Sequence, residues 1–212
     1  MSEIQHAGGY LIQKCKLTSS SGLVFPDFEK LITGIDIFEN IFTNSITGHI
    51  EVVETVNLPT NMPLTGQDFL ELTIVTPGLE DEPIIDHVFC INQIQSREEL
   101  SVGSQFYILS IVTPETLRNN RTRVSASYTD LNSNTIEKVL KDKQLLATTK
   151  KLNIEKTNGI RRHIPSNVRP FDFIKNLSRE STSGINSSSP HYFFYENTRG
   201  FNFVTLDNLY NK

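Results

Sequence analysis

The amino-acid sequence predicts an α+β protein with a β-rich first part and a smaller α+β second part. Apolar residues recur at period two in the first half and at helical spacing in the second. The charge also changes sign along the chain. Residues 1–112 hold 4 Lys and Arg against 15 Asp and Glu, a net charge of −11, whereas residues 113–212 hold 16 against 9, a net charge of +7. We therefore predict a boundary near Thr113–Pro114, with domains 1–114 and 115–212.

Six segments of the first half have the pattern of β-strands. In Leu31–Glu39, for example, Ile35 and Ile37 face one side and Asp36 faces the other. The six segments are Tyr10–Thr18, Leu31–Glu39, Ile46–Val56, Phe69–Thr76, His87–Gln95 and Gln105–Val112. Turn residues separate them at Ser19–Gly22, Pro59, Pro63 and Pro77-Gly78. Such a run, without an amphipathic helix, predicts a small closed or nearly closed barrel, or a sandwich. We expect Phe38–Phe42 to form either a bulge or a short irregular segment.

A first helix is predicted over Asn134–Leu146. Asn134 is the expected N-cap, and Glu137 forms a favourable pair with Lys141 one turn later. The residues at helical spacing are Ile136, Val139, Leu140 and Lys143.

A second helix and a hairpin follow. Pro170 is placed to begin the helix, and the apolar stripe along it ends at the Ser-rich stretch Ser181–Ser189. The stripe consists of Phe171, Ile174 and Leu177. Two aromatic-rich strands, His191–Tyr195 and Phe201–Leu206, then flank a Gly-containing loop and predict a β-hairpin.

No catalytic or cofactor motif stands out in the sequence. HExxH, GxSxG, GxGxxG and GxxxxGK[ST] are all missing, so we predict no catalytic residues, no cofactor and no metal. The five histidines lack the spacing of a zinc site and are expected to be surface or strand residues. They are His6, His49, His87, His163 and His191. Cys15 and Cys90 are expected to be buried, reduced thiols.

Two charged groups were considered as binding sites. Glu80-Asp81-Glu82 carries the oxygen ligands that suit calcium, but three carboxylates between two prolines are more typical of a solvated loop, and Glu98-Glu99 is equally undiagnostic. Two basic clusters lie in the second half: Arg118, Arg121 and Arg123, and then Arg161, Arg162 and His163. Without interleaved aromatics these favour a solvated surface or an acidic partner over nucleic acid.

The N-terminal residues and the hydropathy bear on localisation. MSEIQHAGGYLIQKCK lacks the basic and apolar regions of a signal peptide, and no apolar run reaches the length of a membrane span. We expect a protein made in a cytoplasm and not inserted into a membrane.

The order of these elements resembles the baseplate central hub protein of contractile-tailed bacteriophages. The stretch LITGIDIFENIFTNSITGHIEVVETVNLPTNMPLTGQDFLELTIVTP (Leu31–Pro77) is similar to the first, tail-tube-like barrel domain of that family. The helix TIEKVL, the helix start PFDFI and the hairpin HYFFYENTRGFNFVTLDNLY are similar in order to the α+β domain that follows the barrel.

The resemblance implies a structural role in the virion. Hub subunits form a ring, usually a trimer, that joins the tail-tube ring to the central spike and contacts other baseplate proteins, while DNA passes through its lumen without specific binding. The family has no catalytic residues. Its members are longer and contain a second barrel, so this chain is expected to be a truncated protein, the first part of a split hub, or a protein with only the first half.

The charge distribution leads to one further hypothesis. An acidic lumen would let DNA slide, because Lys and Arg would bind phosphate, so part of the −11 half is expected to line the channel. The alternatives are another viral tail adaptor, such as a tube-terminal or tail-spike attachment protein, a β-domain module that binds carbohydrate or peptide, and an unrecognised enzyme. The sequence has no Trp, which argues against a sugar platform.

Overall fold

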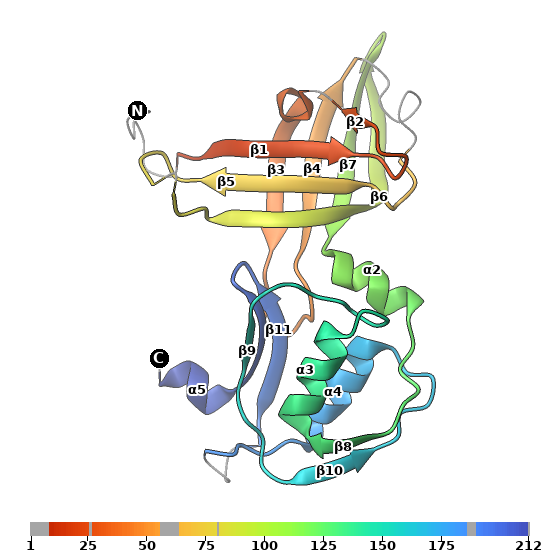
Figure 1. Cartoon of the computed structure of the whole chain (residues 1–212). Coiled ribbons are helices and arrows are strands. Elements are labelled where there is room, and N and C mark those ends of the chain that lie inside the picture. The colour runs from red at the N-terminus through yellow and green to blue at the C-terminus, as the bar shows by residue number, and fades with distance from the viewer. Residues whose placement is uncertain (1–8, 26, 56–63, 80, 186–189, 212) are drawn as a thin grey trace. The chain divides into compact units, whose positions relative to one another are not determined.

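The computed structural model describes residues 9–25, 27–55, 64–79, 81–185 and 190–211 (Figure 1). Contacts along the chain separate it into two compact units. The first unit consists of Met1–Phe38 and Thr47–Pro114, and the second of Glu39–Ile46 and Glu115–Lys212. The loop Glu39–Ile46 therefore belongs with the second unit, although the strands on both sides of it belong to the first. No feature of the sequence pattern led us to expect this.

One antiparallel sheet forms the first unit, with the strand order β2-β1-β5-β6-β7-β4-β3. The strands are β1 (Leu11–Thr18), β2 (Val24–Phe25), β3 (Ile32–Phe38), β4 (Thr47–Glu54), β5 (Phe69–Val75), β6 (Ile85–Ser101) and β7 (Ser104–Val112). All six predicted segments are confirmed as strands. The short β2 was not predicted, and β6 continues well past the expected Gln95. Pro59, Pro63 and the end of Ile46–Val56 lie outside the described residues.

Of the architectures predicted for the first part, the fully closed barrel is excluded, because β2 and β3 are the two edges of the sheet and do not pair with each other. After the two residues of β2, Asp27 adopts a left-handed conformation with φ 55°, which ends strand geometry. The chain then forms the 3₁₀ turn η1 (Phe28–Leu31), whose Phe28 is completely buried. Because η1 packs against β1 and β4, it fills the opening that a closing strand would occupy.

Strand β6 bends the sheet over its own apolar side. Its pairing with β7 slips between Ile91 and Gln93 and again between Gln95 and Glu98, and such bulges bend a strand. Figure 1 shows the result within this unit: β1 and β5 run across the direction of β3, β4 and β7. The core enclosed in this way includes Leu17, Phe28, Ile50, Leu72, Phe89, Tyr107 and Leu109.

The second unit combines a three-stranded sheet, a two-stranded ribbon and helices. The sheet has the order β11-β12-β9, with β12 parallel to β9, and the ribbon pairs β8 with β10. The elements are α2 (Pro114–Arg121), β8 (Tyr128–Leu131), α3 (Asn132–Lys141), β9 (Leu152–Ile154), β10 (Ile160–His163), α4 (Pro170–Glu180), β11 (Tyr192–Asn197), β12 (Gly200–Thr205) and α5 (Leu206–Tyr210). Helix α3 packs against α4, β8 and β9, and α4 packs against β11. These contacts enclose a core rich in aromatic residues.

The second predicted helix is confirmed as α4. Pro170 occupies its first turn, where the missing N–H costs no hydrogen bond. Phe171, Ile174 and Leu177 are all buried, so the apolar stripe faces the core as expected.

The first predicted helix is shifted in the structure. Helix α3 begins at Asn132 and ends at Lys141, and the amide of Asn134 donates to the Asp130 carboxylate at 2.9 Å instead of capping the helix. The apolar spacing beyond Lys141 belongs to a turn, since Leu146 is buried in the core without being helical. The Glu137–Lys141 ion pair is confirmed at 2.5 Å.

The terminal hairpin is confirmed, with β11 one residue longer than predicted and β12 shifted by one residue towards the N-terminus. Asn197 pairs with Gly200, so the loop has only two residues between the strands. Gly200 has φ 125°, and a Cβ there would lie 2.1 Å from the carbonyl oxygen of Lys151. That carbonyl accepts from the Phe201 N–H at 3.0 Å. Only glycine allows this close approach. Helices α2 and α5 and strands β8 to β10 were not predicted.

Candidate functional site

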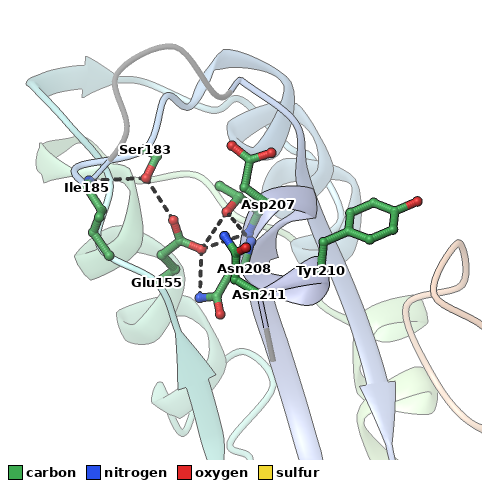
Figure 2. A pocket seen from close by; sticks show the side chains of 8 residues that line it. Glu155, Ser183, Ile185, Asp207, Asn208, Tyr210 and Asn211 are labelled. Atoms are coloured by element: carbon green, nitrogen blue, oxygen red, sulfur yellow. Dashed lines mark hydrogen bonds between the residues drawn. The ribbon is translucent and has the colours of Figure 1, made fainter.

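Figure 2 shows a pocket that is lined mainly by polar residues. It has a volume of about 420 Å³ and lies where β9, β12 and α5 meet the loop after α4. Its lining residues are Glu155, Ser183, Ile185, Thr205, Asp207, Asn208, Tyr210 and Asn211. The Tyr210 ring is exposed and points away from the carboxylate of Glu155.

The carboxylate of Glu155 is the centre of this site, and it is buried despite its charge. One of its oxygens, Oε1, accepts from Ser183 Oγ at 2.8 Å. The other, Oε2, accepts from the N–H and the hydroxyl of Thr205 at 2.9 and 2.8 Å, and from Asn208 Nδ2 at 3.1 Å. The hydrogen bonds to both oxygens of Glu155 therefore come from residues of the same unit. The hydroxyl of Thr205 is also the N-cap of α5 and accepts from the Asn208 N–H at 3.3 Å.

The hydrogen bonds set the charge of this carboxyl group. Burial alone would raise the pKa of Glu155, but the hydrogen bonds from Thr205, Ser183 and Asn208 together outweigh it and hold the pKa below the ordinary value. Nearby, burial and then the charge of Glu155 raise the pKa of Tyr192 to about 12. An ionised, multiply bonded carboxylate is a poor proton acceptor. The geometry fits a structural role, in which Glu155 ties β9 to the start of α5 and to Ser183.

A second cluster of buried charges lies between α2, β11 and the turn that leads to β9. Lys150 Nζ is 2.8 Å from Glu115 Oε2 and 2.5 Å from Glu196 Oε1. Only 16% of the lysine side chain is exposed, and the two carboxylates are almost completely buried. Thr148 Oγ1 donates to the other oxygen of Glu115 at 2.7 Å. The lysine also lies 5.6 Å from the centre of the Phe201 ring.

Glu196 also binds the loop Glu39–Ile46 to the second unit. Its Oε2 accepts from the N–H of Ile46 at 3.1 Å, and Ile46 is completely buried. At the other end of the loop, Glu39 Oε1 accepts from the Thr198 N–H at 2.5 Å. Burial raises the pKa of Glu196, although Lys150 and the Ile46 N–H act in the opposite direction. This cluster could not be predicted from sequence patterns, because its members are far apart along the chain.

The histidines that we considered from the sequence do not come together. His163 Nε2 lies 2.8 Å from the Asn132 amide oxygen, and its ring packs against Phe173. His49 and His87 make edge contacts with Phe38 and Phe89. His6 lies outside the described residues. Across the described parts of the chain, no group of three His, Cys, Asp or Glu side chains has the geometry to hold a metal ion.

The remaining candidates are also dispersed. Cys15 and Cys90 are free thiols; Cys90 is buried, and Cys15 is partly buried, which raises its pKa to about 12. Asp81 and Glu82 are exposed, whereas Glu80 lies outside the described residues. Glu98 and Glu99 are also exposed, and so are the five arginines of the two basic clusters. In the described segments, no helix is both long and apolar enough to cross a membrane.

Comparison with known proteins identifies the fold. The chain is similar to the 43 kDa tail protein of prophage MuSo2 from Shewanella oneidensis, with a TM-score of 0.57 and 10% identity over 90% of this chain and 53% of that one. It is also similar to the tail protein from Neisseria meningitidis MC58, with a TM-score of 0.53 and 10% identity over 92% of this chain and 50% of that one. No family model matches the sequence, and no curated protein matches it.

These likenesses confirm the resemblance to phage tail proteins at the level of the fold. The α+β class is confirmed as well, with an open sheet in place of a closed barrel. The chain spans about half the length of the two tail proteins.

Proposed function

We propose that this protein is a non-enzymatic structural subunit of a bacteriophage tail, and specifically a baseplate hub subunit. The observation that carries the proposal is the fold that nine tenths of the chain shares with the prophage MuSo2 tail protein. In this role the chain, as a virion protein, joins the tail-tube ring to the central spike. It forms a ring with other copies, a trimer in the hub family, and contacts further baseplate proteins. Residues 1–114 and 115–212 act as its two domains.

One face of the first unit supports the idea of a DNA channel. Burial alternates along β4, so that Ile50 and Val52 point into the core while His49 and Glu51 point to the opposite face. Residues directly paired across strands share a face, which extends this surface over β3, β7 and β6. Besides Gly34, Val112 and Cys90, through which the same side of the sheet continues onto β5, its members are Asp36, Phe38, Thr47, His49, Glu51, Val53, Gln93, Gln95, Glu98, Phe106, Ile108 and Ser110.

The composition of this surface, which we call the polar face, suits passing DNA. It carries three carboxylates and neither Lys nor Arg among those twelve residues. Cations would bind the phosphate backbone, since neutralising phosphates releases counterions, whereas carboxylates repel it. We therefore propose that the polar face lines the channel.

Labelling of particles tests the assignment. Antibodies against the chain, applied to tail particles from the source of the gene and viewed by electron microscopy, should bind at the end of the tail distal to the capsid. Label at the capsid-proximal end would indicate a tube-terminal protein. No label on any particle would overturn the tail role.

Charge reversal tests the polar face. Particles with Asp36→Lys and Glu51→Lys should assemble but release their DNA at least about tenfold less efficiently, because two cations then face the phosphates. The matched control is Asp81→Lys with Glu82→Lys, the same charge change in an exposed loop outside the polar face. Equal loss in both variants would contradict the channel assignment.

A further inference from the structure

The two units carry opposite charges. The first unit contains 14 Asp and Glu against 4 Lys and Arg, a net charge of −10. The second contains 10 against 16, a net charge of +6. Charges of this size and opposite sign attract over about a Debye length, which is ~10 Å at 0.1 M salt.

Within the second unit, three lysines form ion pairs, whereas the arginines form none among the described residues. Lys138, Lys141 and Lys150 each lie within 2.8 Å of a carboxylate oxygen of the same unit. All eight arginines of this unit are exposed, and none has a carboxylate within ion-pair distance among the described residues. Four of them lie in α2, just after it, or just before α4. These are Arg118, Arg121, Arg123 and Arg169.

The fold brings these four arginines together. Val124 and Val168 exchange backbone hydrogen bonds at 2.7 and 3.3 Å, which sets the preceding Arg123 beside Arg169. Arg118 and Arg121 lie in α2, whose Asn119 accepts from the Phe171 N–H at 2.8 Å and so ties α2 to the start of α4.

Arg123 is held in place at the centre of the group. Its guanidinium donates to the carbonyl oxygens of Asn120 and Thr122 at 3.1 and 2.7 Å. We call the four residues the arginine cluster.

The chemistry of the cluster favours a carboxylate-bearing protein surface as its partner. Guanidinium groups bind carboxylates in two-pronged geometry and are enriched at protein interfaces, whereas lysines are depleted there. Single-stranded nucleic acid is bound by basic grooves that also offer aromatic rings for stacking. No Phe or Tyr lies between residues 114 and 127, and the ring nearest in sequence to Arg169, that of Phe171, is buried in the core.

We propose that the arginine cluster of one copy of this chain binds the acidic first unit of a second copy. Such a contact joins different surfaces of two identical chains. It gives a two-fold dimer where both copies make it reciprocally, and otherwise a closed ring or a growing filament. The inference deepens the assembly role proposed above by naming a partner surface. The proposed contact requires only two copies of the chain. If the purified chain stays monomeric, the contact is disproved, whereas the proposed role as a tail protein is not.

Sedimentation of the full chain tests the proposal. At about 50 mM NaCl the protein should self-associate, and at about 500 mM NaCl, where the Debye length is only a few ångströms, it should dissociate. Arg118→Glu, Arg121→Glu and Arg123→Glu together should weaken association at low salt about tenfold or more. The matched control reverses three exposed cations of the same unit outside the cluster, Arg161→Glu, Arg162→Glu and Lys175→Glu, and should associate like the unmodified chain.

Three outcomes would overturn the proposal. The first is a monomer at low salt and high protein concentration. The second is equal weakening in both triple variants, which would indicate net charge rather than the cluster. The third is cluster-dependent binding of a fluorescein-labelled DNA 20-mer, measured by anisotropy, in a chain that does not self-associate. Thermal melting of each variant, followed by circular dichroism, shows that a lost interaction is not lost folding.

Discussion

The two units of this protein bury different kinds of side chain. The core of the first is almost entirely apolar, and its described buried polar residues are only Ser19, Glu54, Asp68 and Thr113. Asp68 accepts from the N–H groups of Thr65 and Gly66 next to it and of Ser20, which is 48 positions away along the chain. The second unit buries an ion cluster around Lys150 and a carboxylate, Glu155, that no cation neutralises among the described residues.

This difference shows two ways to specify a fold. An apolar sheet is stabilised by burial of surface, which is nondirectional and depends on pattern and volume. A buried ion cluster depends on specific partners, because an unpaired charge in the interior is strongly destabilising. We therefore expect the first unit to be sensitive to lost volume and the second to lost partners.

The largest effect is expected for Lys150→Met. This change leaves the carboxylates of Glu115 and Glu196 buried next to each other without their cation, which should lower the free energy of unfolding by about 3–5 kcal/mol. Urea unfolding gives the magnitude, and hydrogen exchange followed by mass spectrometry should locate the loss of protection in the second unit.

Lys141→Met is the matched control. It removes the same charge from the exposed pair with Glu137, and should cost about 0.5 kcal/mol or less. Equal effects of the two substitutions would contradict the view that the Lys150 cluster carries much of the specificity of the second unit.

Leu109→Ala tests the first unit. Leu109 is completely buried in β7, and its truncation should cost about 3 kcal/mol through lost burial and the cavity left behind. Val53→Ala, on the polar face of the neighbouring strand β4, should cost about 1 kcal/mol or less, because Val53 is only partly buried. Similar losses at both sites would show that the polar face is covered in solution.

The same contrast explains what could be predicted from the sequence. Strands with one buried face repeat at period two, so Leu31–Glu39 and Phe69–Thr76 were predictable within a residue or two. Helix α4 was predictable because Pro170 and the apolar stripe coincide. The sequence did not predict the short β2 or the buried Phe28 of η1, which together leave the barrel open.

The polar clusters could not be predicted for a physical reason. Glu196 and the N–H of Ile46 are separated by 150 positions, and the bond between them is a product of the tertiary fold. Glu155 appears in the sequence as an ordinary surface glutamate between Ile154 and Lys156. Asn134 misled us, because its side chain binds Asp130 and the helix starts two residues earlier.

Glu155→Gln should cost about 1–3 kcal/mol at neutral pH, since the substitution sets an amide donor against the donors of Thr205, Ser183 or Asn208. The pH dependence has a definite sign. The pKa of Glu155 is lowered in the fold from its ordinary 4.5, so the stability it contributes is complete above that pH and is lost as the pH falls through the folded value. The variant should therefore lose less stability than the unmodified chain between about pH 5 and pH 3.

Glu196→Gln is the contrasting variant for the pH experiment. The pKa of Glu196 is raised, first by burial, so its ionisation opposes folding as the pH rises through the ordinary range and towards the folded value. This variant should therefore keep the acid-induced loss that originates at Glu155. The free energy of unfolding, measured in urea at several pH values, distinguishes the contributions of Glu155 and Glu196. If Glu155→Gln loses as much stability at acid pH as the unmodified chain, the role assigned to Glu155 is contradicted.

The smallest changes in stability are expected when one tyrosine hydroxyl group is removed from each unit. Tyr107, in the core of the first unit, is completely buried, and its hydroxyl has no hydrogen-bond partner among the described residues. Tyr192, in the second unit, donates to the carbonyl oxygen of Lys156 at 3.1 Å. Tyr107→Phe should leave the free energy of unfolding unchanged or raise it by up to about 1 kcal/mol, whereas Tyr192→Phe should lower it by about 1 kcal/mol. Because the two substitutions remove the same atom, opposite signs would show that the hydroxyl of Tyr192 stabilises the second unit and that the hydroxyl of Tyr107 does not stabilise the first. A loss at Tyr107 would reveal a hydrogen bond through bound water.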